Sequence, residues 1–382
     1  MKEPTLYDTI SAYKSKARFH MPSHGGERID ELYSAARFDI TELSFSDNLA
    51  SPNGIIEEAE RNMALAVGSP YSLFFTCGAT SAIFTALKVA SHHVGEFILL
   101  GEVHASVINA LELFNVPYKK AESVRGAKGG IVLTSPDYYG NTENVAEIRR
   151  DNPDALLIVD EAHGAHFAYS RLLPESALNH ADLTIHGMHK TMPVYGGGAL
   201  LHVRREDLYL EAREARRKLH SSSPSYLVMA SMDYARALFE ENGERYYKEI
   251  KAKLDSLVLP EGFSRVLNDD FSRLVIEVPA HTSGYAVAKK AEKNGIYFEM
   301  ADSTRLTAII TPFNLKNLDS LKELTAPEKE KEELGFLLGE KAKNDLILYP
   351  PGRILIKKGD IIDKETLSII ESEKARILGL WI

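Results

Sequence analysis

Lys190 is the residue with the most evident chemical potential in this chain. It lies in His186-Gly187-Met188-His189-Lys190-Thr191, directly after a stretch of β-type sequence and before Gly196-Gly197-Gly198. A lysine in such a crowded, glycine-rich place can give up its proton and act as an amine nucleophile. Taken alone, a lysine is usually a solvated surface residue, so this interpretation depends on the residues that the fold brings beside it.

Asp160 is the second candidate, because it directly follows the apolar stretch Ala155-Leu156-Leu157-Ile158-Val159. A carboxylate that ends a buried strand needs a partner, since an unpaired buried charge is costly. The letters Asp160-Glu161-Ala162-His163 also occur in nucleotide-driven helicases. That interpretation requires a phosphate loop of the form G-x-x-x-x-G-K-[ST], which the sequence lacks, so we exclude it.

Two further segments follow β-like stretches. Thr76-Cys77-Gly78-Ala79-Thr80-Ser81-Ala82 precedes a helical pattern, and such a helix start offers backbone and hydroxyl donors to a phosphate. The alternative is that Thr80 or Ser81 simply caps the helix. His104, in Glu102-Val103-His104-Ala105-Ser106, has a flat ring that could stack on a planar ligand or only cap a helix.

Along the chain these groups follow one another in a fixed order. A segment suited to bind phosphate comes first, then the flat ring of His104, the buried carboxylate of Asp160 and the nucleophilic Lys190. Pyridoxal phosphate needs this set of groups. Its phosphate needs donors, its pyridine nitrogen needs an acid partner, and its aldehyde takes a Schiff base from lysine. The order of the residues therefore predicts a pyridoxal phosphate site, and we expect no metal.

Alternating β-rich and helical segments must position these residues, a pattern typical of parallel strands joined by crossover helices. The predicted strands are 97–100, 130–134, 155–159, 183–185 and 199–203. The predicted helices are 80–93, 105–115, 143–151 and 205–218. Residues from about 55 to 220 are expected to form an α/β domain with its ligand at the carboxyl ends of the strands.

The rest of the chain predicts a second, smaller domain. Apolar spacing over 225–258 indicates one long helix or two abutting ones, a natural bridge between domains. A helix at 283–294 and β-like stretches at 274–278, 296–301 and 305–311 suggest an α+β domain. We expect an N-terminal segment 1–55, a large domain 56–245 and a small domain 246–382.

Composition excludes several classes of protein. The 382 residues, 44% hydrophobic and 26% charged, suit a folded chain of about two domains and exclude long disorder. A net charge of -9 has the wrong sign for coating nucleic acid or an anionic membrane. With a single cysteine, no secretory signal and no apolar run of about 20 residues, the chain is expected to be cytoplasmic and without a membrane segment.

The sequence also resembles the fold-type I, aspartate-aminotransferase-like enzymes, and among them the bacterial ornithine/lysine/arginine decarboxylases. Phe19-His20-Met21-Pro22-Ser23-His24-Gly25-Gly26 is similar to that family's T-P-G-H-K-G-G. Asp160-Glu161-Ala162-His163-Gly164-Ala165-His166 is similar to its D-E-A-H-G-A-H. Other segments similar to family motifs are Asp39-Ile40-Thr41-Glu42, Asp47-Asn48-Leu49, Pro52-Asn53-Gly54, Ser221-Ser222-Ser223-Pro224-Ser225-Tyr226, Glu299-Met300-Ala301-Asp302 and Tyr349-Pro350-Pro351-Gly352.

The resemblance implies the aspartate aminotransferase fold, with a large α/β domain around a mainly parallel sheet and a small α+β carboxyl-terminal domain. It implies that Lys190 forms the Schiff base and that Asp160 pairs with the protonated pyridine nitrogen. His104 would stack on one ring face and Ala162 on the other, and His189 would contact phosphate or relay protons. The remaining implied residues are Gly78, Ala79, Thr80, Ser81 and His163 for the cofactor, Ser221 and Ser222 from the neighbouring subunit of a homodimer, and Glu299 and His24 for the substrate.

Some positions depart from the family pattern. Gly187 takes the place of serine in Ser-x-His-Lys, so a phosphate donor is missing or is replaced by a backbone N–H. Arg353 stands where the family has apolar residues or proline. Because the pattern runs from about Phe19 to Asp360, we expect a minimal member without the amino-terminal wing domain of larger ones.

The resemblance favours α-decarboxylation of lysine, ornithine or arginine to CO2 and the corresponding amine, a reaction of polyamine synthesis. Another reaction on the same cofactor, transamination or C–S or C–N lysis, is an alternative, with Arg305 or Arg353 holding the α-carboxylate. A third possibility is a catalytically silent homologue that binds the cofactor and regulates a partner enzyme. Retention of Lys190, Asp160 and His104 argues against that possibility.

Overall fold

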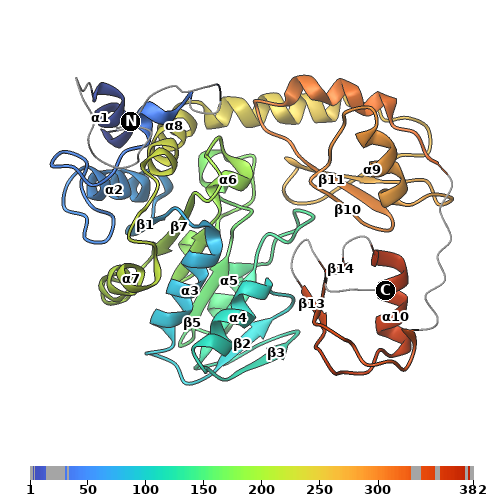
Figure 1. Ribbon diagram of the computed structural model, residues 1–382, viewed down its shortest axis with the longest axis horizontal. Helices are drawn as coiled ribbons and strands as arrows, with labels where there is room; N and C mark the ends of the chain where they lie inside the picture. The colour runs from blue at the N-terminus through green and yellow to red at the C-terminus, as the bar shows by residue number, and fades with distance from the viewer. Residues whose placement is uncertain are drawn as a thin grey trace. The chain divides into compact units, whose positions relative to one another are not determined.

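The computed structural model describes residues 3, 5–13, 31, 34–327, 337–348, 353–374 and 377–378. The chain packs into two units, which Figure 1 shows in one view. The first unit comprises residues 1–136 and 142–245, and the second comprises 137–141 and 246–382. The domain boundaries predicted from the sequence did not separate the short segment 137–141, which belongs with the second unit.

A seven-stranded sheet forms the centre of the first unit, with strand order β1-β7-β6-β5-β4-β2-β3. The strands are β1 (Tyr71–Phe75), β2 (Phe97–Leu100), β3 (Tyr118–Ala121), β4 (Gly130–Thr134), β5 (Leu156–Asp160), β6 (Leu183–His186) and β7 (Ala199–Val203). Neighbouring strands from β6 to β3 are parallel, whereas β7 is antiparallel to both β1 and β6. As a result, the carboxyl ends of β1, β2, β4, β5 and β6 lie at one edge of the sheet, together with the amino end of β7.

Continuous apolar sequence explains why these segments pair. Every residue of β5 and of β7 is buried, as expected for strands covered on both faces. Gly130 opens β4, where a Cβ would lie 2.3 Å from the Phe97 ring on β2. The mainly parallel α/β fold and its predicted strands are confirmed, with β5 shifted by one residue to end at Asp160 and β6 extended to His186.

The helices of the first unit are α1 (Thr5–Ala12), α2 (Ile55–Val67), α3 (Gly78–Ala90), α4 (Ala105–Leu113), α5 (Val145–Asp151), α6 (Met188–Thr191) and α7 (Glu206–Leu219), with 3₁₀ turns η2 (Ala36–Phe38), η3 (Phe167–Tyr169) and η4 (Ala177–Asn179). Helix α3 begins earlier than predicted, because its N-cap is Cys77. Strand β3 was not predicted. It exposes Lys119 and Lys120 at the edge of the sheet and therefore lacks an apolar run.

Two small sheets organise the second unit, a four-stranded one in the order β10-β11-β9-β8 and a three-stranded one in the order β13-β12-β14. Their strands are β8 (Ser264–Val266), β9 (Arg273–Glu277), β10 (Met300–Ala301), β11 (Arg305–Ile309), β12 (Leu346–Leu348), β13 (Arg353–Ile356) and β14 (Ile377–Leu378). The helices are α9 (Gly284–Glu292), the 3₁₀ helix η5 (Leu315–Glu323) and α10 (Lys364–Glu373). The predicted strand 296–301 is mostly wrong, since only Met300 and Ala301 pair with β11.

Helix α8 (Tyr226–Asp255) is continuous over 30 residues, which confirms the single-helix interpretation of 225–258. Its residues up to Arg245 belong to the first unit, and the remainder belong to the second. Within the described part of the chain, no helix combines the length and the apolar character needed to cross a membrane.

Candidate active site

Lys190 lies on α6, just beyond the carboxyl end of β6, and its Nζ is 2.9 Å from Nε2 of His163. Gly187, the N-cap of α6, donates its N–H to the Ala162 carbonyl (3.1 Å), so the loops after β5 and β6 are joined. A Cβ at Gly187 would lie 2.9 Å from that carbonyl oxygen and 3.2 Å from Cδ of Lys190. This close approach favours glycine and accounts for the departure from the family's serine.

Asp160 and Glu161 are adjacent buried acids with different surroundings. Glu161 accepts hydrogen bonds from the Ser176 hydroxyl and from Nε2 of His186 (2.7 Å). Asp160 is only 4% exposed and accepts the Ala162 N–H through Oδ1 at 3.2 Å. Because the protein supplies strong partners to Glu161, Asp160 is the acid with capacity left for a ligand.

Thr134 ends β4 and pairs with Asp160 in the register of β4 and β5. Its hydroxyl oxygen is inaccessible to solvent and has no hydrogen-bond partner among the described residues. An unmet buried polar group costs about 1–3 kcal/mol, so a polar ligand atom at this point would be stabilising. Thr134 was not among the predicted site residues, because a hydroxyl residue at a strand end is common and only its unmet hydrogen bond distinguishes it.

His104 caps α4, whose Ser106 N–H donates to Nδ1 of the ring at 3.1 Å. In the neutral ring the proton is therefore on Nε2. Burial lowers the pKa of His104, the Asp160 carboxylate partly opposes that shift, and the Lys190 ammonium adds to it. His104 is thus a helix cap, and it also lies within electrostatic reach of Asp160 and Lys190.

The turn between β1 and α3 offers backbone donors. Neither Thr80 nor Ser81 caps α3, so the capping alternative is wrong; the Ser81 hydroxyl instead donates to the Cys77 carbonyl (3.1 Å). The N–H groups of Ala79 and Thr80 lie in the first helical turn, where the helix supplies no acceptor. The Thr80 side chain is exposed. These groups are the ones best suited to hold a phosphate.

The glycine segment 196–198, at the amino end of β7, is tied to both reactive loops. The Gly78 N–H donates to the Gly197 carbonyl at 2.7 Å and is therefore already used by the protein. The Gly198 carbonyl is 2.9 Å from Nδ1 of His189, which leaves Nε2 of that ring for a ligand.

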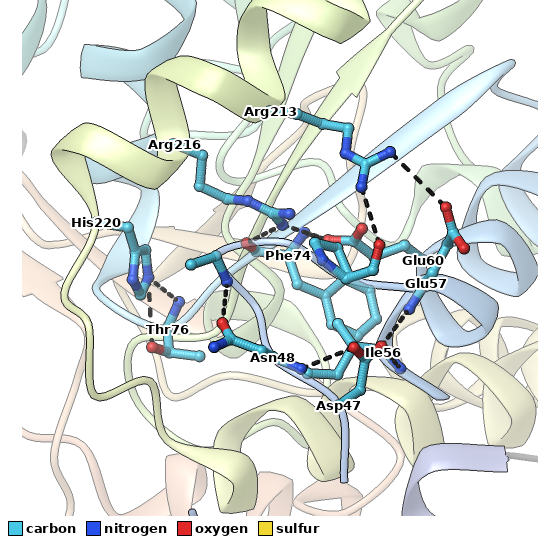
Figure 2. A network of polar contacts seen from close by, with 12 residues as sticks. Asp47, Asn48, Ile56, Glu57, Glu60, Phe74, Thr76, Arg213, Arg216 and His220 are labelled. Carbon is cyan, nitrogen blue, oxygen red and sulfur yellow. Dashed lines mark hydrogen bonds and ion pairs between the residues drawn. The ribbon is translucent and has the colours of Figure 1, made fainter. Parts of the chain in front are cut away.

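A buried ion pair between Glu60 of α2 and Arg216 of α7 holds the end of β1 (Figure 2). The Phe74 N–H donates to Glu60 Oε1 (2.7 Å), and Nη1 of Arg216 donates to the Phe74 carbonyl (3.2 Å). Burial raises the pKa of Glu60, and the Arg216 guanidinium opposes that shift. Two residues beyond Phe74, the Thr76 N–H donates to Nε2 of His220 at 3.0 Å.

Asp47, in one of the family-like motifs, has a structural role. Its Oδ2 accepts the N–H groups of Gly54 (2.8 Å) and Ile56 (3.0 Å) at the start of α2, as Figure 2 shows in part. The Tyr226 hydroxyl donates to the Asp47 carbonyl (2.6 Å). This motif therefore fixes the helix that carries Glu60.

Ser221 and Ser222 are exposed in the segment after α7, and the Ser221 hydroxyl accepts the Ser223 N–H at 3.1 Å. His24 lies outside the described residues, as do the surrounding motif 19–26 and the motif 349–352.

In the second unit, Glu299 is exposed and accepts a hydrogen bond from the Tyr138 hydroxyl. It lines a cavity of about 300 Å³ with Tyr297, Phe298 and other residues of that unit. Next along the chain, the Tyr139 hydroxyl donates to Asp302 at 2.7 Å. Neither tyrosine was predicted as a site residue, since nothing in their immediate sequence indicates a partner more than 150 residues away.

Comparisons with known proteins show which proteins this chain is similar to. A family model described as the Orn/Lys/Arg decarboxylase major domain matches residues 116–255. YaaO of Bacillus subtilis (strain 168), described as an uncharacterized protein, is 28% identical and the alignment covers 96% of this chain and 94% of YaaO. An arginine decarboxylase of the same strain is 25% identical, with 96% of this chain and 93% of that protein covered.

Solved structures show the same fold. Lysine decarboxylase A from Pseudomonas aeruginosa is similar with a TM-score of 0.75 at 16% identity, covering 97% of this chain and 76% of that one. The constitutive lysine decarboxylase of E. coli has a TM-score of 0.71 at 16% identity, with 96% and 76% covered. The chain is similar to the Orn/Lys/Arg decarboxylase family, and these comparisons indicate a decarboxylase that depends on pyridoxal phosphate.

Proposed function

We propose that this enzyme removes the α-carboxylate of lysine, ornithine or arginine and releases CO2 and the corresponding amine. The observation that carries the proposal is the set of groups at one sheet edge. The Lys190 amine lies beside His163, and the buried Asp160 carboxylate pairs in register with Thr134, whose hydroxyl has no partner among the described residues. Relatives named arginine decarboxylase support a basic substrate. The proposed decarboxylation requires that these residues can hold pyridoxal phosphate.

The residues fit pyridoxal phosphate. Asp160 would hold the proton on the pyridine nitrogen, the N–H groups of Ala79 and Thr80 would bind the phosphate, and Lys190 would hold the cofactor covalently. The Thr134 hydroxyl, unmet in the described structure, has capacity for a polar atom of the ring. When bound, the cofactor supplies an electron sink for the pair left on Cα as CO2 departs.

The protein's own part is to manage protons. Lys190 must be neutral to act as a nucleophile, and Nε2 of His163, 2.9 Å away, can take the proton that the ammonium loses. After CO2 leaves, a proton returns to Cα from Nζ of Lys190 or from Nε2 of His189. Because the pKa of His104 is lowered, its ring is neutral near pH 7 and can stack without repelling a protonated pyridine.

Specificity and assembly complete the proposal. Glu299 is proposed to bind the distal cationic group of the substrate, with its carboxylate oriented by Tyr138. Ser221 and Ser222 are proposed to reach the phosphate of a neighbouring subunit in a homodimer, and 56–245 is proposed as the cofactor-binding domain. Glu299→Gln should raise KM for the basic substrate about 10-fold and leave the cofactor absorbance unchanged.

The test is a substrate panel on protein loaded with cofactor. Lysine, ornithine, arginine and alanine are each supplied, and CO2, amine and keto acid are measured. Equal amounts of CO2 and amine from a basic amino acid support the proposal. Keto acid without CO2 would identify an aminotransferase instead, and cofactor binding without any turnover would favour a silent regulatory homologue.

A further inference from the structure

His220, at the carboxyl end of α7, joins the turn after β1 to the segment that follows α7. Its Nε2 accepts the Thr76 N–H at 3.0 Å, and its Nδ1 is 3.1 Å from the Ser221 carbonyl oxygen (Figure 2 shows the first contact). Thr76 directly follows β1, and Ser221 begins the segment of exposed serines. His220 thus connects the turn before α3 with the serine segment.

These contacts determine which ring nitrogen carries the proton. A backbone N–H can only donate, so Nε2 must hold a lone pair. A backbone carbonyl can only accept, so Nδ1 must carry the hydrogen. Both hydrogen bonds therefore exist only in the neutral ring with its proton on Nδ1. If Nε2 were also protonated, its N–H would face the Thr76 N–H, and the hydrogen bond between them would be lost.

The surroundings of the ring favour this neutral form. Burial lowers the pKa of His220, the hydrogen bond to Ser221 opposes that shift, and the Arg216 guanidinium on the same helix adds to it. Arg216 is paired with Glu60 of α2. From β1, the Phe75 ring lies 5.8 Å from the imidazole, centroid to centroid.

The turn that His220 holds is also bonded to Gly197. The Gly78 N–H donates to the Gly197 carbonyl, and a Cβ on Gly197 would lie 2.6 Å from the Thr76 carbonyl oxygen. Thr76 lies beyond the last paired residue of β1, so the sheet supplies no acceptor for its N–H in that register. His220 therefore supplies the acceptor that fixes the start of the turn.

We propose that His220 is a positioning residue for the cofactor phosphate. Neutral, it holds Thr76 and so directs the Ala79 and Thr80 N–H groups at the phosphate; protonated, it releases the turn. The inference rests on the proposed function, because it assumes that this turn binds the phosphate.

The test measures binding of pyridoxal phosphate, and of pyridoxal without the phosphate, to apoprotein between pH 7.5 and pH 5.5. His220→Ala removes the acceptor and should weaken pyridoxal phosphate binding about 5- to 10-fold at pH 7.5, the size of one hydrogen bond. His220→Gln presents an amide oxygen that does not titrate. It should bind nearly as tightly as wild type at pH 7.5 and lose less affinity at pH 5.5. Exposed His281→Gln is the matched control and should follow wild type at both pH values.

Two results would overturn the inference. One is His220→Ala binding pyridoxal phosphate with wild-type affinity and pH dependence. The other is an equal loss for pyridoxal, which would indicate general disruption of the fold rather than positioning of the phosphate turn. Borohydride reduction and peptide mapping of the loaded wild type test the underlying function separately. A label away from Lys190 rejects the proposed function, whereas a label on Lys190 with unchanged His220→Ala binding rejects this inference alone.

Discussion

Two neighbouring regions of the first unit use their polar groups in opposite ways. In the first, which we term the buried chain, Ser72, His202, His186 and Glu161 are linked in sequence across β1, β7, β6 and the end of β5. The Ser72 hydroxyl is 2.7 Å from Nδ1 of His202, Nε2 of His202 is 3.0 Å from Nδ1 of His186, and Nε2 of His186 is 2.7 Å from Glu161. All four residues are at most 3% exposed.

In the second region, the strand-end site of Lys190, Asp160, Thr134 and His104, the Thr134 hydroxyl has no hydrogen-bond partner among the described residues, and Asp160 accepts the Ala162 N–H. The contrast is sharpest at the adjacent acids, since Glu161 belongs to the buried chain and Asp160 to the site. Polar groups that the protein satisfies contribute to folding, whereas those with spare capacity await a ligand. Substitutions in the two regions should therefore separate stability from cofactor binding.

The largest expected effect is at Lys190. Lys190→Ala removes the proposed nucleophile and should lower CO2 release by at least about 10⁴-fold, because no neighbouring group replaces an amine. The free energy of unfolding of the apoprotein should change little. The measurements are CO2 release and urea unfolding, with exposed Lys290→Ala as the control. Substantial CO2 release by Lys190→Ala would refute the assignment.

The next largest effect is in the buried chain. His186→Leu leaves the Glu161 charge buried without its imidazole partner, which should lower the free energy of unfolding by about 3–5 kcal/mol. The pair of His180 and Glu175, whose side chains are 27% and 62% exposed, offers a matched comparison, and His180→Leu should cost less than about 1 kcal/mol. Urea unfolding of both apoproteins checks this. Equal losses would show that burial does not distinguish the two pairs.

The buried chain should also make stability depend on pH. Burial lowers the pKa of His202 well below its usual range, and His186 lowers it further. Below about pH 6.5 His202 is protonated in the unfolded chain but remains neutral in the folded chain. The free energy of unfolding therefore decreases as the pH is lowered, by up to about 1.4 kcal/mol per pH unit. The free energy of unfolding of His202→Gln, measured with urea, should decrease less steeply than that of the wild type between pH 6.5 and pH 5. Parallel slopes for variant and wild type would contradict the assignment of the effect to His202.

The smallest effect is at Thr134. Thr134→Val removes an unmet buried hydroxyl, so the apoprotein should keep its stability or gain up to about 1 kcal/mol, while affinity for pyridoxal phosphate falls about 5-fold. Thr307 in the second unit is a buried threonine whose hydroxyl also lacks a partner among the described residues. Thr307→Val is the control and should leave cofactor affinity unchanged. If Thr134→Val binds pyridoxal phosphate as tightly as the control Thr307→Val does, Thr134 has no role in cofactor binding.

The sequence predicted the strand ends and the chemically active residues on them, because apolar runs bounded by polar residues carry that information locally. It did not predict the buried chain, since His186 and His202 meet only through the antiparallel pairing of β6 and β7. Thr134 was not predicted either, because its significance depends on a hydroxyl group that the fold leaves without a hydrogen-bond partner among the described residues. The three-stranded sheet was also missed, since the short strands Leu346–Leu348 and Ile377–Leu378 are far apart in the chain.

The reversed direction of β7 has a consequence for engineering this enzyme. Because β7 is antiparallel to its neighbours, the glycines that precede it lie beside the loops that follow β1 and β6. The Gly197 carbonyl bonds Gly78 of the first loop, and the Gly198 carbonyl bonds His189 of the second. A Cβ at Gly197 would lie 2.6 Å from the Thr76 carbonyl oxygen, and one at Gly198 would lie 2.4 Å from the Val194 side chain, so both positions are poor places for sequence diversity in a mutant library. If Glu299 binds the substrate as proposed, changes aimed at substrate preference are better placed among the residues that line its cavity.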